Sequence, residues 1–234
     1  GTDLNPTARL ISLAKTRDYE IGALRAEVDS FLEGLEERLQ PIENYEGFPE
    51  PEFVTFDRLE DWFPAKSIGE ICICMNLIEK VEDEKTHLFL RIALSECLRL
   101  VSYQRNREFK LYRIAEADRE GFYVSLFPLL EARIRRNLEG CEAFSEIVAP
   151  STCAAIHGFN TVEESGLAKL GRNPDIVVTS PPYGDSGTTV AYAQFSWLTN
   201  IWLGLDPRSG ALDRELMGGG KKEVAEFGFG PMDD

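Results

Sequence analysis

Long apolar runs are missing from this sequence of 234 residues. No stretch reaches the roughly 18 uninterrupted apolar residues of a membrane span, so no membrane partner is expected. Histidine is scarce, with two residues, and the five cysteines show no Cys-x-x-Cys spacing. A bound metal is therefore not expected. Free, buried thiols in a reducing compartment account better for the cysteines.

Positive charge is also in short supply, with 25 Lys and Arg against 40 Asp and Glu and a net charge of −15. Phosphate contacts need Lys and Arg, so the total argues against non-specific binding of nucleic acid. Residues 99–113, "RLVSYQRNREFKLYR", reverse this trend and interleave basic with aromatic side chains. Such a mixture predicts a nucleic-acid surface, and a solvated helix end is the alternative. The residues expected to contact nucleic acid here are Arg105, Arg107, Lys110 and Arg113.

The first residues, "GTDLNPTARLISLAKT", predict the end of a strand followed directly by a helix. Asn5 is a favourable N-cap, and Pro6 occupies the first helical position, where its missing N–H costs nothing. Asp3 then lies between the strand and the helix. This order places a carboxylate at the carboxyl edge of an α/β sheet.

The middle of the chain, residues 16–150, predicts a mostly helical block, and the pattern changes after it. Apolar residues at helical spacing predict helices at 18–40, 68–79, 85–102 and 120–138. After the block come an apolar run, "CAAIHGF", and a β-branched stretch, "DIVVT", which predicts a strand at 175–179. We therefore predict an α/β fold in which a partial parallel sheet, from 1–15 and 151–234, carries a large helical insertion.

The predicted strand at 175–179 ends in an unusual tetrapeptide, Ser180-Pro181-Pro182-Tyr183. Two adjacent prolines remove two backbone donors and restrict both φ angles. Tyr183 is consequently held in a fixed direction. Costly local structure of this kind is often found at functional sites, although a surface turn is the alternative.

The tetrapeptide suits the alkylation of an exocyclic base amine, whose lone pair is delocalised into the ring. Ser180 Oγ and the Pro181 carbonyl can accept the amine hydrogens, so that the nitrogen lone pair points at an electrophile. Tyr183 offers a ring on which the base can stack. The base must first be flipped out of its duplex, and alignment with a sulfonium methyl then supplies much of the catalysis.

The stretch "TSPPYGDSGTTVAYAQFS" resembles motif IV of amino-methylating DNA methyltransferases, in the restriction-modification branch that carries Ser-Pro-Pro-Tyr. Most members of that branch methylate cytosine N4. The opening residues are similar to the segment that follows the glycine-rich cofactor loop in the same branch. The resemblance implies a Rossmann-like fold that uses S-adenosylmethionine. The catalytic residues that it implies are Ser180, Pro181, Pro182 and Tyr183.

The same resemblance implies a cofactor site and a DNA site. Asp3 matches the residue that binds the ribose hydroxyls, Asn5 is placed beside it, and Asn160 is assigned to the cofactor adenine. Asp185 is expected in the base pocket, although a turn explains it equally well. The helical block is then a candidate target-recognition region, double-stranded DNA is the partner, and the prokaryotic cytoplasm is the expected location.

Two departures from the family pattern leave alternatives open. The glycine-rich loop should precede Asp3 and is absent from the sequence, so we expect another chain segment or a partner subunit to complete the cofactor site. Adenine N6 methylation uses the same chemistry, and Ser180 in place of Asp or Asn argues against it. Ser180 also disfavours RNA or protein amide methylation. A non-catalytic DNA-binding or scaffold subunit is the remaining alternative.

Overall fold

The structure, a computed structural model, describes residues 1–40, 58–105, 111–149, 151–160, 168–170, 174–179 and 192–205. The α-helices in these ranges are α1 (Pro6–Thr16), α2 (Ile21–Leu39), α3 (Ala65–Ile78), α4 (Glu84–Leu98), α5 (Leu126–Ile147) and α7 (Tyr192–Trp202). Short 3-10 helices span Leu59–Asp61, Glu116–Asp118 and Ala168–Leu170. The four helices predicted in the middle of the chain are confirmed with shifted ends.

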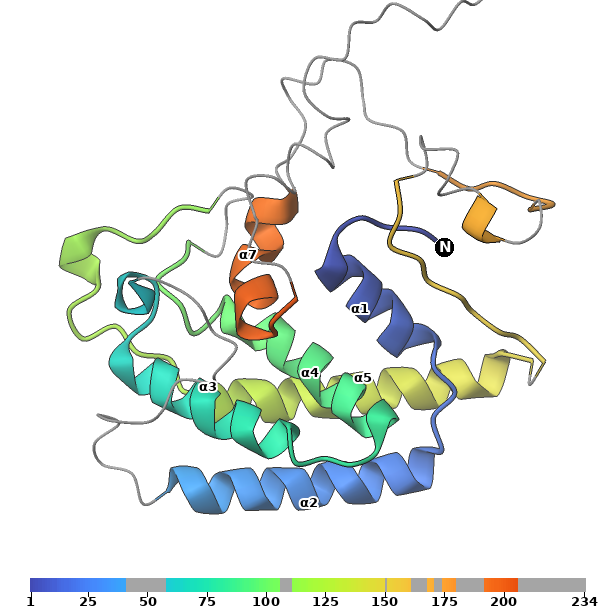
Figure 1. Cartoon of the computed structure of the whole chain (residues 1–234). Helices are drawn as coiled ribbons and strands as arrows, with labels where there is room; N and C mark the ends of the chain where they lie inside the picture. The colour runs from blue at the N-terminus through green and yellow to red at the C-terminus, as the bar shows by residue number, and fades with distance from the viewer. Residues whose placement is uncertain are drawn as a thin grey trace, which may run out of the picture.

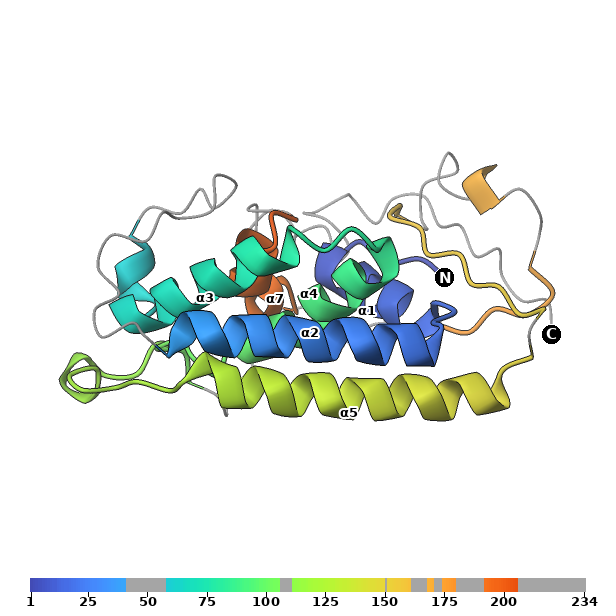
Figure 2. The same cartoon turned by 90° about the horizontal axis from the view of Figure 1, so that it is seen from below.

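Helix α4 is the centre of the fold and contacts each of the other five α-helices (Figure 1). Its residues Leu90, Leu94 and Leu98 recur at a spacing of four, which puts them on one face, and all three are fully buried. Figure 2 shows the long helices α2 and α5 side by side along one face of the molecule. Helices α1 and α7 pack on α4 and on each other.

One apolar core extends through most of the described helices, including α7. Trp202 of α7 is fully buried and meets the ring of Phe63 edge to face at 5.7 Å between centroids. Leu10 of α1 is partly buried against the same core. The helical block 16–150 therefore shares its core with helices from both flanking segments.

Strand pairing within the described ranges consists of two isolated bridges, a parallel one at Thr2 and His157 and an antiparallel one at Gln104 and Arg113. The strand predicted at 175–179 is not formed: residues 176–178 are between 74% and 93% exposed. β-Branched residues favour a strand only where a neighbouring strand and an apolar surface receive them. No described segment pairs with this one, and the Rossmann-like sheet stays a prediction.

The five cysteines are all free thiols. Burial raises the pKa of Cys97 to about 12 and that of Cys74 well above its ordinary value, so these thiols stay protonated and pack as small apolar groups. In the ranges that the structure describes, no three His, Cys, Asp or Glu side chains gather into a metal-binding group. No helix in those ranges has the length and apolarity to cross a membrane.

Candidate functional site

Asp3 lies where the backbone of the first residues forms hydrogen bonds with a segment that follows the helical block in the sequence. The His157 N–H donates to the Gly1 carbonyl at 2.9 Å, and the Asp3 N–H donates to the His157 carbonyl at 3.1 Å. Helix α1 begins three residues after Asp3, capped by the Asn5 side chain, which accepts from the Thr7 N–H at 3.1 Å. The predicted helix start after Asp3 is confirmed, whereas the predicted strand end before it is a single isolated bridge at Thr2.

The two oxygens of the Asp3 carboxylate differ in their hydrogen bonding. Its Oδ1 accepts from the Asn5 N–H at 2.7 Å, and no described residue bonds its Oδ2. The side chain is half-exposed, so Oδ2 can accept from a sugar hydroxyl. Asn160, also half-exposed, follows His157 by three residues, and its predicted contact with the cofactor adenine stays a prediction. The free carboxylate oxygen of Asp3 fits the nucleoside end of S-adenosylmethionine as an acceptor for a sugar hydroxyl.

Arg9 contacts both backbone segments next to Asp3, and the sequence analysis did not predict it as a site residue. Its Nη1 donates to the backbone carbonyls of Asp3, at 3.0 Å, and Leu4, at 2.7 Å. A Cβ atom at Gly158 would lie 2.8 Å from Arg9 Cζ, so glycine is what allows the guanidinium to approach the 157–160 segment. Nothing in the sequence pattern distinguishes Arg9 from a solvated helical arginine.

Asn5 is only 8% exposed, and both polar atoms of its side chain have protein partners. Its Oδ1 accepts from the Thr7 N–H, and its Nδ2 donates to Ser196 Oγ at 3.0 Å. Ser196 belongs to α7, the first described element after the Ser-Pro-Pro-Tyr motif. The predicted contact between Asn5 and the cofactor stays a prediction.

Several predicted site residues lie outside the ranges that the structure describes. They are Ser180, Pro181, Pro182, Tyr183, Asp185, Arg107 and Lys110.

The other two predicted nucleic-acid residues, Arg105 and Arg113, are described. They belong to two backbone segments that pair with each other in antiparallel directions. The Arg105 N–H donates to the Tyr112 carbonyl at 2.8 Å, and the Ile114 N–H donates to the Tyr103 carbonyl at 2.7 Å. Helix α4 already ends at Leu98, so neither arginine is part of a helix end. The run thus begins at the C-cap of α4, Arg99, and continues past the helix end; both interpretations of it, as a nucleic-acid surface and as a solvated helix end, stay predictions.

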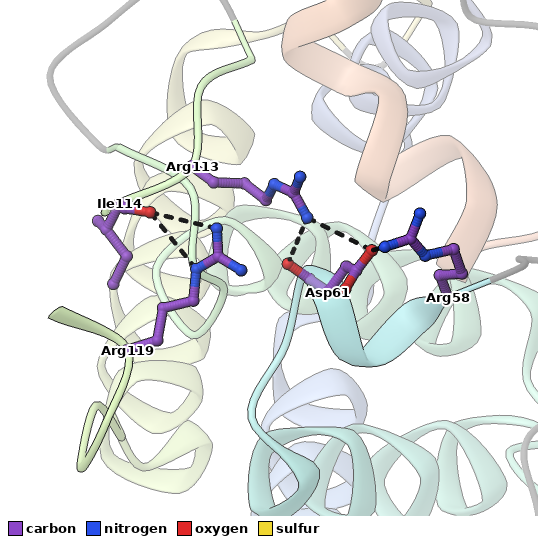
Figure 3. Close-up of polar contacts among 5 residues, drawn as sticks. All are labelled: Arg58, Asp61, Arg113, Ile114 and Arg119. Atoms are coloured by element: carbon purple, nitrogen blue, oxygen red, sulfur yellow. Dashed lines mark hydrogen bonds and ion pairs between the residues drawn. The ribbon is translucent and has the colours of Figure 1, made fainter. Parts of the chain in front are cut away.

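Five arginines surround this antiparallel pair, and we call them the arginine cluster: Arg58, Arg99, Arg105, Arg113 and Arg119. Figure 3 shows Arg58 and Arg113 converging on Asp61 Oδ2, at 2.6 and 3.5 Å. The guanidinium of Arg119 instead donates to the Ile114 carbonyl, at 3.4 Å from both Nε and Nη2. One carboxylate thus pairs with two guanidinium groups.

Aromatic rings connect the arginine cluster to α7. The guanidinium carbon of Arg99 lies 4.1 Å from the ring centroid of Phe195, within cation–π range. Trp197 meets Trp62 edge to face at 5.2 Å, and Arg113 lies 5.1 Å from the Trp62 ring. Phe195 is 47% exposed, so its ring is accessible beside the cationic groups. The cluster is therefore joined to the helix that follows the Ser-Pro-Pro-Tyr motif.

Comparison with known proteins finds a relative among the type II methyltransferases. This relative, M.MvaI of Kocuria varians, is 33% identical to the chain over 227 residues. The match covers 94% of this chain, so it includes most of the helical block. It covers 50% of M.MvaI, so the chain spans about half the length of this relative. No protein-family model and no solved structure matches the chain.

Proposed function

We propose that the chain is part of an S-adenosylmethionine-dependent methyltransferase that modifies an exocyclic amine of a DNA base. The similarity to a type II methyltransferase and the Ser-Pro-Pro-Tyr motif support this class. The observation that carries the proposal is the packing of α1 against α7. It brings the Asp3 edge close to the helix that follows the motif, and a methyl donor and its acceptor must meet in this way.

In this proposal Asp3 binds the ribose hydroxyls, with Asn160 at the adenine. Ser180 Oγ and the Pro181 carbonyl accept the amine hydrogens, and Tyr183 stacks on the flipped base. The cofactor supplies a methyl group on a sulfonium centre. As the nitrogen becomes tetrahedral, Ser180 Oγ and the Pro181 carbonyl accept hydrogen bonds from its N–H groups, and the excess proton passes to solvent water. The helical block, through the arginine cluster, contacts the DNA backbone.

Cytosine N4 is the favoured target because Ser180 stands where adenine-modifying relatives more often have Asp or Asn. Mass spectrometry of nucleosides from DNA incubated with the native protein and S-adenosylmethionine tests this. We expect N4-methylcytosine, which chromatographic retention separates from its isomer 5-methylcytosine. Detection of N6-methyladenine would leave the proposed enzyme class unchanged and would show that the target base is adenine. The absence of any methylated nucleoside would contradict the proposal and favour the non-catalytic DNA-binding alternative.

Asp3 is expected to contribute to cofactor affinity. Asp3→Ala should weaken S-adenosylmethionine binding by about 1–3 kcal/mol, because charged hydrogen bonds to the ribose are removed. Asp3→Asn is the matched control: it keeps an acceptor for the Asn5 N–H, and it replaces the charge and the second acceptor oxygen by an NH2 donor. Isothermal titration calorimetry measures the S-adenosylmethionine affinity of both variants. An unchanged affinity in both would show that Asp3 is not part of the cofactor site.

The arginine cluster and its neighbouring basic residues are expected to bind DNA phosphates. Arg105→Ala combined with Arg107→Ala should lower DNA affinity and reduce the slope of its salt dependence by about one for each phosphate that is no longer neutralised. Arg25→Ala with Arg38→Ala makes the same charge change on α2, on the far side of α4 from α7 (Figures 1 and 2). Binding titrations at several salt concentrations should separate the two pairs. Equal slopes would show that the arginines at 105 and 107 do not bind DNA phosphates.

A further inference from the structure

One apolar stripe of helix α7 continues beyond the core of the molecule. Phe195, Leu198 and Trp202 are spaced along the helix so that they lie on one face of it. Leu198 and Trp202 are 3% and 0% exposed, whereas Phe195, in the first turn, is 47% exposed. The stripe therefore presents a phenylalanine ring to solvent at the end where α7 begins.

The position of this ring is fixed by the packing of α7 on α4. The two helices meet in opposite directions, at contacts that recur every four residues: Arg91 with Leu203, Ser95 with Thr199, and Arg99 with Phe195. The first two contacts are hydrogen bonds to the backbone carbonyls of Leu203 and Ser95. The third is a cation–π contact, in which the guanidinium carbon of Arg99 lies 4.1 Å from the ring centroid. The exposed ring is thus the outermost member of a regular series of contacts.

Other groups of the arginine cluster lie beside this cation–π pair. Arg99 Nη2 donates to the Arg105 carbonyl at 3.0 Å, so the backbone that carries Arg105 adjoins the pair. The Arg105 N–H in turn donates to the carbonyl of Tyr112, which is 48% exposed. Glu96, the nearest acidic residue along α4, forms its ion pair with Arg133, at 3.0 Å. Guanidinium groups and exposed aromatic side chains therefore occur together at this end of α4.

An exposed ring stacked on a guanidinium group has the chemistry of a contact with a nucleic-acid base. A phenylalanine ring carries no hydrogen-bonding group, so it binds through its flat apolar surface. Every base has a π-face, and proteins that bind unpaired nucleic acid combine aromatic rings with the cation–π contribution of arginine. In a paired duplex the faces of each base are covered by its neighbours. A ring of this kind consequently favours bases that are unstacked or unpaired.

We propose that Phe195, held against Arg99, is a stacking contact for an unpaired DNA base. This inference rests on the DNA partner of the proposed function, in which base flipping takes a base out of the stack. Phe195 is a binding residue in this proposal and takes no part in methyl transfer. Its contribution to affinity is separate from the phosphate contacts proposed for Arg105, because it carries no charge.

The test measures binding of the native protein that carries this chain to a labelled single-stranded oligonucleotide and to the same sequence as a duplex. A single strand presents unpaired bases without the need for a recognition sequence or a flipping step. Phe195→Leu removes the ring and keeps an apolar side chain. We expect its Kd for the single strand to rise about fivefold or more, and its Kd for the duplex to change less than about twofold. Fluorescence anisotropy at several salt concentrations should give the wild-type salt slope, because no charge is lost.

Two variants serve as controls. Phe195→Tyr keeps the ring and should bind the single strand as the wild type does. Phe144→Leu makes the same change at a ring that is 36% exposed, on the last turns of α5, well away from α7 (Figures 1 and 2). It should leave both Kd values unchanged. If Phe195→Leu does not fold, Phe195→Met also removes the ring and is expected to give the same rise in the single-strand Kd.

An unchanged single-strand Kd in Phe195→Leu, or an equal rise in Phe195→Tyr or Phe144→Leu, would overturn the inference and leave the proposed function standing. Absence of methyl transfer by the unaltered protein, together with the expected loss in Phe195→Leu, would overturn the proposed enzyme activity and support the inference for a non-catalytic DNA-binding subunit.

Discussion

Replacing Tyr183 by alanine is expected to remove most methyl transfer, because the flipped base loses about 1–3 kcal/mol of stacking. Tyr183→Phe keeps the ring and should keep much of the activity. Ser180→Ala should lower turnover more than DNA affinity, since its hydrogen bond strengthens only as the amine nitrogen becomes tetrahedral. Turnover per folded molecule and DNA affinity are the quantities to measure for the three variants.

The melting temperature of each variant separates this prediction from the surface-turn alternative. A tyrosine that only supports a turn would lower the Tm when removed and leave turnover per folded molecule intact. Survival of that turnover in both alanine variants would show that Ser-Pro-Pro-Tyr is not the catalytic motif. The type II similarity would then support only a non-catalytic subunit.

Replacing Glu70 by alanine is expected to destabilise the helical block by about 3 kcal/mol, because it removes a buried carboxylate that accepts several hydrogen bonds. Glu70 is 2% exposed on α3 and accepts from Tyr123 Oη at 2.6 Å and from the Leu126 N–H at 2.9 Å. Leu126 is the first residue of α5, so the carboxylate also stabilises the positive end of that helix.

Glu70→Gln is the control for this prediction. It keeps one acceptor oxygen and loses the charge, so a smaller loss of about 1–2 kcal/mol is expected. Urea unfolding monitored by circular dichroism gives both free energies of unfolding. A loss below about 0.5 kcal/mol in Glu70→Ala, the range of ordinary surface substitutions, would contradict the assigned role.

The local sequence was sufficient to predict a structural element wherever the formation of that element depends on its own residues. The Asn5-Pro6 pair predicts the start of α1, and the structure begins the helix at Pro6 with Asn5 as its cap. Apolar spacing predicts α2 to α5 because the residues on the buried face of a helix recur along the sequence with the period of the helix itself. The order of Asp3, turn and helix is equally local, and it too is confirmed.

Interactions between distant segments could not be read from the sequence. The carboxylate that accepts from the first N–H of α5 belongs to Glu70 of α3, and the partners of Asn5 and Thr7 come from α7. A sequence pattern gives the type of each side chain and no information on which remote group it meets.

The same limit explains the largest difference from prediction, the strand at 175–179. A β-branched run becomes a strand only when another strand pairs with it, and this pairing is a property of the tertiary structure. Residue types by themselves determined helices α1 to α5, the Asp3 turn and the basic run of this protein, whereas α7 was not predicted. Only the packing of α7 against α1 and α4 decided that the turn, the arginine cluster and the helix after the motif lie together, because those contacts form between segments whose local patterns are independent.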